Sequence, residues 1–154
     1  MSKAFVRDDG TESLPELPER PVSPHPNWVT AKGLAMIEGE VARLQGALAE
    51  AQVRNDLPAV AEASRDLRYW TARRASAEAV PPPSGRDKVQ FGSTVTVRRE
   101  ERQDATYRIV GEDEAEPSRG TISYVSPLAR ALLGRAQGEI VDAVGGETEI
   151  LKIE

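Results

Sequence analysis

The hydrophobic pattern of the chain changes its period at a run of prolines, residues 81–85 (Pro-Pro-Pro-Ser-Gly). Proline has no backbone N–H and fixes φ, so neither a helix nor a central strand continues through such a run. Before the run, apolar residues recur with the roughly 3.5-residue spacing of packed helices, and after it they alternate with polar residues as in strands. We therefore predict an α+β chain with a short stiff linker at 81–85.

Residues 30–80 carry two apolar seams of the kind that pack helices together. The first seam has residues spaced alternately by three and four positions, namely Leu34, Ile37, Val41, Leu44, Leu48 and Ala51. The second seam has the same spacing, with Val60, Ala63, Leu67 and Trp70. Residues 54–58 between the seams (Arg-Asn-Asp-Leu-Pro) favour a turn followed by a helix start. This pattern predicts an antiparallel αα-hairpin, a coiled coil capped by Thr30 with its tip near Asp56.

Residues 86–154 follow the period of β-strands. The β-rich runs are residues 89–98, 106–110, 121–125, 140–144 and 149–153. Gly145 and Gly146, between the last two runs, are a hairpin signal. One helix is predicted from Pro127 to Leu133, with Ser126 as its N-cap and Gly134 at its end. The pattern therefore predicts a small antiparallel sheet with one short helix.

Residues 1–29 form a tail in which proline recurs, at Pro15, Pro18, Pro21, Pro24 and Pro26. Such a segment is expected to be extended or disordered, with a polyproline II character. Trp28 and Val29 are the candidates for docking it to the rest of the chain. His25, the only histidine, lies between two prolines without an evident partner, so we expect no catalytic role for it.

Charge and composition narrow the possible functions. The net charge is −5, which argues against autonomous binding to duplex nucleic acid and favours a protein partner with a basic surface. The absence of cysteine excludes thiolate catalysis, disulfides and zinc–thiolate sites. No apolar run is long enough to span a bilayer, so we expect a cytoplasmic protein with no membrane contact. A hairpin that buries its own seam is expected to be monomeric.

Three sequence blocks stand out after the linker, namely residues 91–95 (Phe-Gly-Ser-Thr-Val), 109–112 (Ile-Val-Gly-Glu) and 126–134 (Ser-Pro-Leu-Ala-Arg-Ala-Leu-Leu-Gly). In this order and spacing they resemble the C-terminal domain of the GreA/GreB family of bacterial transcription elongation factors. Residues 30–34 (Thr-Ala-Lys-Gly-Leu) are similar to the family's entry into its first helix. The resemblance implies an FKBP-like fold for residues 86–154.

The resemblance also implies a partner and a division of labour. The partner is RNA polymerase. The C-terminal domain would bind its rim at the mouth of the secondary channel, and the hairpin would enter the channel. Docking would then involve the residues around the third block, namely Tyr124, Ser126, Pro127, Leu128 and Arg130. In GreA and GreB, acidic residues at the tip help to hold the second catalytic magnesium of the polymerase, which then cleaves backtracked RNA.

At the tip the chain departs from the family, whose sequence there is approximately Gly-Asp-Leu-x-Glu-Asn-Ala-Glu-Tyr. Asp56 and Leu57 are kept, but Ala59 stands at the glutamate and Val60 at the asparagine. Alanine cannot ligate a metal, so the chain is predicted to hold no metal by itself, and Asp56 is the candidate ligand within the polymerase complex. In this respect, and in its shorter arms, the chain resembles the short-hairpin Rnk-like variants, which bind polymerase without stimulating cleavage.

We therefore predict a regulator of RNA polymerase, with no enzymatic activity of its own and without strong stimulation of transcript cleavage. An alternative is an active cleavage factor that uses Asp56 together with Glu62. A further alternative from another class is a prolyl isomerase or chaperone-like binding domain, suggested by the FKBP-like fold alone.

The charged and turn-forming residues also have simpler structural interpretations. Asp56 is explained equally by capping a helix, and Ser126 and Pro127 by starting one. The acidic residues 112–116 are typical of a solvated loop, with a basic polymerase surface as the alternative partner. Arginines of the second helix are expected either to pair with acids of the first or to contact phosphates, and they are Arg65, Arg68, Arg73 and Arg74.

Overall fold

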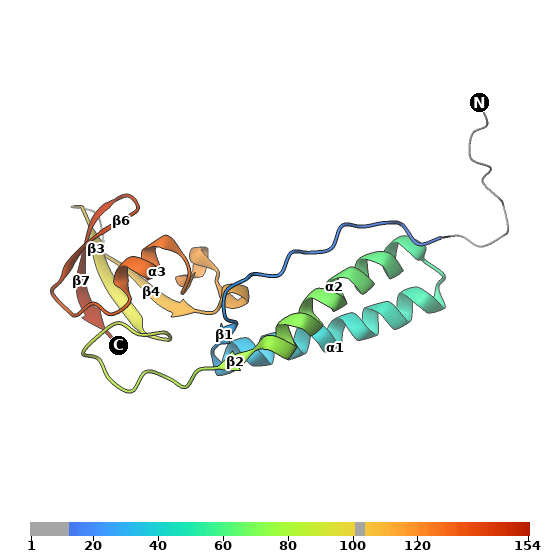
Figure 1. Cartoon of the computed structure of the whole chain (residues 1–154), viewed down its shortest axis with the longest axis horizontal. Helices are drawn as coiled ribbons and strands as arrows, with labels where there is room; N and C mark the ends of the chain where they lie inside the picture. Colours follow the sequence, from blue (N-terminus) through green and yellow to red (C-terminus); the bar gives the residue numbers. More distant parts are fainter. Residues whose placement is uncertain (1–12, 101–103) are drawn as a thin grey trace, which may run out of the picture.

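A computed structural model describes residues 13–100 and 104–154, in which a helical hairpin projects from a smaller β-sheet part (Figure 1). The hairpin consists of α1 (Ala31–Val53) and α2 (Leu57–Ser76), which lie side by side. Thr30 caps α1 as predicted, since its hydroxyl accepts a hydrogen bond from the backbone N–H of Gly33 at 3.0 Å. The predicted antiparallel hairpin is confirmed.

The seam between the two helices is built mainly by the predicted aliphatic residues. The buried ones on α1 are Ile37, Val41, Leu44 and Ala51, and on α2 they are Val60 and Ala63. The seam loosens towards the end of α2, where Leu67 and Trp70 are only half-buried. Trp70 instead lies edge-to-face with Tyr69, with ring centroids 5.1 Å apart. The prediction that Trp70 belongs to the buried seam is therefore only partly correct.

The segment before α1 runs along the outside of the hairpin. We call residues 13–26 the strap; they are extended and follow α2 from the region of the tip to the base (Figure 1). The strap leads into β1 (Trp28–Val29), which pairs in parallel with β2 (Glu78–Ala79) directly after α2. The expectation for the first twelve residues lies outside the described part of the chain.

The sheet part contains five strands in the spatial order β5-β4-β3-β7-β6. Their bounds are Thr94–Arg99 for β3, Asp104–Val110 for β4, Thr121–Ser123 for β5, Ile140–Ala143 for β6 and Gly146–Ile153 for β7. Three pairs are antiparallel as predicted, β3–β4, β3–β7 and β6–β7. The β6–β7 turn contains the predicted glycine pair, and Gly145 and Gly146 both have positive φ, 96° and 117°.

One strand pair corrects the prediction of a purely antiparallel sheet, because β5 runs parallel to β4. The chain between them contains two short 3₁₀ helices, η1 (Glu112–Glu114) and η2 (Pro117–Arg119). Parallel neighbours need a connection that returns the chain to the same end of the sheet, and these two helices are part of that connection. The sequence pattern contained no signal for them beyond a cluster of acidic residues.

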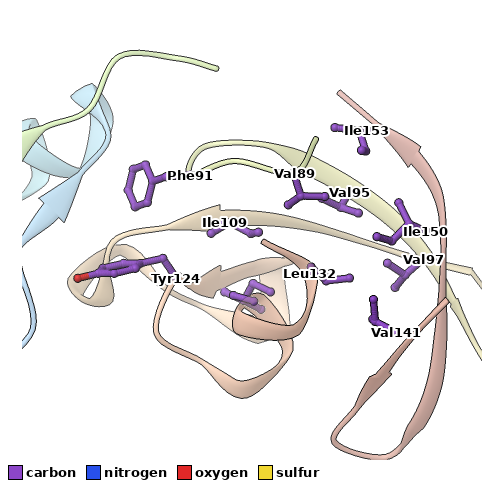
Figure 2. Close-up of a cluster of buried hydrophobic side chains, with 12 residues drawn as sticks. Val89, Phe91, Val95, Val97, Ile109, Tyr124, Leu132, Val141, Ile150 and Ile153 are labelled. Atoms are coloured by element: carbon purple, nitrogen blue, oxygen red, sulfur yellow. The ribbon is translucent and has the colours of Figure 1, made fainter. Parts of the chain in front are cut away.

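The short α-helix α3 (Pro127–Leu132) covers the core of the sheet. Ser126 caps it as predicted, by accepting a hydrogen bond from the N–H of Ala129 at 3.3 Å. The helix ends before Gly134, whose φ is 82° and whose N–H donates to the carbonyl of Val89 at 2.9 Å. Figure 2 shows the core beneath it, which consists of Val89, Phe91, Val95, Val97, Ile109, Ile122, Tyr124, Ala129, Leu132, Val141, Ile150 and Ile153. No helix in residues 13–100 and 104–154 is long and apolar enough to cross a membrane.

Candidate functional site

The predicted docking residues lie in or just before α3, whose own side chains divide into a buried and an exposed set. Ala129 and Leu132 are fully buried against the sheet, which fixes the orientation of the helix. Pro127 and Arg130 are exposed, and Leu128 is half-buried between the two environments. An exposed proline ring next to a guanidinium group offers both apolar area and charge, the combination that protein–protein contacts use.

Tyr124 differs from the other predicted docking residues because its side chain belongs to the core. It is 7% exposed and stacks on Trp28 with ring centroids 4.8 Å apart. Its hydroxyl donates a hydrogen bond to the carbonyl of Pro26. Burial, followed by the negative charge of Glu112, raises the pKa of Tyr124 above its ordinary value. Tyr124 thus attaches the end of the strap to the sheet, and the outer surface of α3 is carried by Pro127 and Arg130.

The tip of the hairpin is a tight turn in which Asp56 has a structural role. Asn55 takes a left-handed conformation with φ 54°, which allows the chain to reverse. The carboxylate of Asp56 accepts a hydrogen bond from the N–H of Ala59 at 3.2 Å and so caps α2. Glu62 is exposed on the next turn of α2. The cap interpretation of Asp56 is therefore supported by a specific contact.

The exposed residues next to the turn are mainly apolar or basic. Val53 at the end of α1 is 88% exposed, and Arg54 and Pro58 are exposed beside it. Within the described ranges, 13–100 and 104–154, no group of three His, Cys, Asp or Glu side chains is placed to hold a metal ion. Asp56 is thus the one acid of the turn itself, residues 54–56, and its carboxylate already accepts a backbone hydrogen bond.

Substitution can separate the capping role of Asp56 from the effect of its negative charge. Asp56→Ala is expected to lower the free energy of unfolding by about 1 kcal/mol, because the α2 cap is lost. Asp56→Asn is expected to change it by only a few tenths of a kcal/mol, since asparagine caps about as well as aspartate. Urea denaturation of both variants measures the difference, and equal losses in the two would contradict the capping role.

The base of the hairpin meets the sheet part at a buried arginine. Arg73 on α2 is 1% exposed, and its Nε lies 2.6 Å from a carboxylate oxygen of Asp113 in η1. A terminal nitrogen of the same guanidinium donates to the side-chain carbonyl of Asn27 at 2.8 Å. Tyr69 donates its hydroxyl to the other oxygen of Asp113 at 2.5 Å. This junction, defined by Asn27, Tyr69, Arg73 and Asp113, ties three separate segments of the chain together.

A second contact between hairpin and sheet involves Glu114 and the first turn of α1. The carboxylate of Glu114 accepts hydrogen bonds from the N–H of Thr30 at 3.0 Å and from the N–H of Gly111 at 3.0 Å. The Thr30 hydroxyl also donates to it. Gly33 faces the same carboxylate, and any side chain at this position would collide with Glu114. The acidic residues 112–114 therefore join the two parts of the chain, which corrects their interpretation as a solvated loop.

The arginines of α2 do not pair with acids of α1 in the described part of the chain. Arg65 pairs with Asp66 on its own helix at 3.1 Å, and Arg68 pairs with Glu19 of the strap at 2.5 Å. Arg73 pairs with η1, and Arg74 is exposed. The predicted interhelical pairing is therefore replaced by contacts with segments outside the hairpin.

Sequence reasoning missed the junction, although one signal for it exists. Arg73 follows Trp70 by three positions, so it continues the apolar seam of α2 into a charged residue. A charged residue at a buried position requires an opposite charge or several hydrogen bonds. The pattern could thus have indicated that an acid lies near Arg73, but the spacing carries no information on which one.

The junction also changes the titration of Tyr69. Burial, together with the hydrogen bond to Asp113, raises the pKa of Tyr69 to about 12 from an ordinary value of 10. Because the folded-state pKa is the higher one, the stabilisation is fully present below pH 10 and is lost as the pH rises towards 12. Since the side chain is half-exposed, we discount the effect for screening to about 1 kcal/mol.

We expect this loss between pH 10 and pH 12 to be absent in Tyr69→Phe. The urea midpoints of the wild type and of Tyr69→Phe, followed over this range, measure the difference. Parallel curves for the two proteins would contradict the assignment.

Comparisons with known proteins agree with the resemblance of the sequence blocks. Residues 83–154 match the family described as "Transcription elongation factor, GreA/GreB, C-term". The chain is 35% identical over 149 residues to transcription elongation factor GreA of Alkalilimnicola ehrlichii, covering 82% of this chain and 94% of that protein. It is 36% identical over 151 residues to GreA of Pseudomonas aeruginosa, covering 82% and 94%.

Among solved structures, the GreA factor homolog 1 (Gfh1) of Thermus thermophilus is similar with a TM-score of 0.40 and 22% identity. The alignment covers 84% of this chain and 99% of that chain.

Proposed function

Since the chain belongs to the GreA/GreB family of transcription elongation factors, we propose that it regulates transcription by binding RNA polymerase at the rim of the secondary channel. In this proposal the sheet part docks on the rim and the hairpin enters the channel. The protein acts on the polymerase without carrying out a reaction itself, and it works as a monomer because the hairpin buries its own seam.

The proposal rests on the small number of free carboxylates at the tip of the hairpin. A second catalytic metal needs additional carboxylate ligands and an oriented water molecule. Ala59 has no side-chain oxygen, and the carboxylate of Asp56 is engaged with the N–H of Ala59 itself. We therefore propose that the hairpin occupies the channel without strongly stimulating transcript cleavage. If the tip contributes to the polymerase magnesium at all, Asp56 is the residue that does so.

Docking is assigned to the outer surface of α3. Ser126 and Pro127 fix the start of the helix, and the exposed Pro127 and Arg130 present its contact surface, with the half-buried Leu128 at the edge. A rigid helix that is fixed to a packed core loses little conformational freedom on binding, which favours affinity.

The proposal is tested with purified, backtracked RNA polymerase complexes. Transcript cleavage is measured without a factor, with this protein, with a cleavage-competent GreA, and with both proteins together. We expect little cleavage with this protein alone and a dose-dependent suppression of the cleavage that GreA stimulates. Stimulation by this protein alone would overturn the proposal.

The same assay examines the alternative in which Asp56 and Glu62 together support cleavage. If the wild type stimulates cleavage and Asp56→Asn with Glu62→Gln abolishes it, the tip acids reach the metal. Asp56→Asn is the informative change, because it keeps the helix cap while removing the charge.

A further inference from the structure

In the strap, proline and burial both repeat every three residues. Every third residue therefore forms a half-buried inner edge, and the residues between form two exposed outer edges. Proline occurs at every third position from Pro15 to Pro24, and the residue before a proline is itself confined to extended conformations. A chain restricted in this way favours a polyproline II helix, which has three residues per turn. Burial follows the same period, because Leu17, Arg20 and Ser23 are half-buried and every other residue of the strap is exposed.

The middle residue of the inner edge, Arg20, contacts three side chains of α2. Its guanidinium lies 4.0 Å from the ring centroid of Tyr69 and 5.7 Å from that of Trp70. It also lies 3.5 Å from a carboxylate oxygen of Asp66. The neighbouring Glu19 accepts two hydrogen bonds from Nε and a terminal nitrogen of Arg68, at 3.0 and 2.5 Å.

The contacts of Arg20 are partly open to solvent and that of Glu19 is largely so, and each is therefore individually weak. The Arg68 and Glu19 side chains are 56% and 62% exposed, so their attraction is screened by salt. By contrast, Asn27 just after the strap is buried in the junction, and Trp28 stacks on Tyr124. The strap is thus firmly held at its C-terminal end and loosely held along α2.

We propose that the strap is a releasable, autoinhibitory cover of α2, with Arg20 as its latch. In the closed state it shields the flank of the hairpin that carries Tyr69 and Trp70, and in the open state it leaves that flank free. The proposal rests on the proposed function in one respect, since the covered flank belongs to the hairpin that is assigned to the polymerase channel. The prolines keep the open strap extended, so that closing again costs little conformational entropy.

The first test follows the strap in the protein alone. The full chain is labelled with 5-fluorotryptophan, which gives separate ¹⁹F resonances for Trp28 and Trp70, and Trp70→Phe assigns them. Arg20→Ala removes the cation–π contact and one ion pair, which is expected to reduce the ratio of closed to open strap about tenfold. The matched control is Arg43→Ala, which removes an exposed, ion-paired arginine of α1 that does not touch the strap.

We expect the Trp70 resonance of Arg20→Ala at low salt to move towards its position in the wild type at high salt. Arg20→Lys should restore part of the wild-type position, and the Trp28 resonance and Arg43→Ala should show no such shift. A Trp70 resonance that responds neither to Arg20→Ala nor to salt would overturn the proposal.

The second test measures binding to RNA polymerase by competition with GreA. If about ten of every eleven molecules have a closed strap, the ratio of closed to open strap is about ten. Reducing this ratio tenfold raises the open fraction, and with it the affinity for polymerase, about fivefold. Unchanged affinity in Arg20→Ala, despite an open strap in the ¹⁹F spectrum, would overturn the autoinhibitory role. Absence of polymerase binding in every variant would instead overturn the proposed function, while the ¹⁹F result would still decide whether the strap opens.

Discussion

Replacing Arg73 by methionine is expected to lower the free energy of unfolding by about 3–5 kcal/mol. Methionine fills much of the same space, but it leaves the buried carboxylate of Asp113 without its cation and the side-chain carbonyl of Asn27 without its donor. The Asp113 side chain is only 5% exposed, so water cannot compensate fully. Urea denaturation followed by circular dichroism measures the loss.

Two further variants show whether the loss comes from the unpaired charge. Arg74→Met removes the neighbouring exposed arginine and is expected to change the free energy of unfolding by less than about 0.5 kcal/mol. Adding Asp113→Leu to Arg73→Met removes both members of the closest ion pair and is expected to recover part of the stability, while Glu112, which lies 3.7 Å from Arg73 in the wild type, stays without this cation. A loss below about 1 kcal/mol in Arg73→Met would mean that the junction contributes little to stability.

Arg130→Glu is expected to weaken binding to RNA polymerase about 10- to 100-fold, or about 1.4–2.8 kcal/mol. The proposed docking surface places this exposed guanidinium in the interface, where glutamate removes its five hydrogen-bond donors and brings a carboxylate that cannot replace them. Fluorescence anisotropy of labelled protein, titrated with purified polymerase, measures the affinity.

Arg135→Glu is the matched control, since Arg135 is also exposed but lies beyond the end of α3. We expect its affinity to stay within a factor of about three of the wild type, because long-range electrostatic effects of single exposed charges are small. Both variants should keep the wild-type urea midpoint. Equal weakening by the two substitutions would show that binding responds to overall charge and would remove α3 as the docking surface.

Elements that local pattern determines were predictable from the sequence. The seam spacing located both helices, and Thr30, Asp56 and Ser126 all cap the helices that they were expected to cap. A cap bonds to backbone two or three residues away, so its whole cause lies within one short window. The same holds for the glycine pair of the β6–β7 turn.

Elements that depend on distant residues were not predictable in this way. Arg73 and Asp113 are separated by 40 residues, and no periodicity connects an arginine in a helix with an acid in a loop. The parallel placement of β5 likewise depends on how η1 and η2 fold, and the acidic residues of this segment were predicted to form a solvated loop. Tyr124 was predicted to be a docking residue because it lies next to α3. Its burial, however, depends on Trp28, which lies far from it in the sequence, before the hairpin.

The candidate site divides in the same way. The resemblance identified Asp56 and the α3 residues, and the structure added that the Asp56 carboxylate already caps a helix. The strap contacts could not be derived, because weak exposed ion pairs leave no signature in the sequence.

The junction at Arg73 has a mechanical consequence for the far end of the hairpin. The hairpin is a lever as long as the 23 residues of α1, or about 35 Å, and it pivots at the junction near the end of α2. A tilt of about 10° at the junction would carry the tip sideways by about 6 Å, twice the length of a hydrogen bond. The direction of the tip therefore depends on the junction and on the Glu114 contact at the opposite end of the hairpin, because their directional hydrogen bonds fix an angle that apolar packing alone would leave looser.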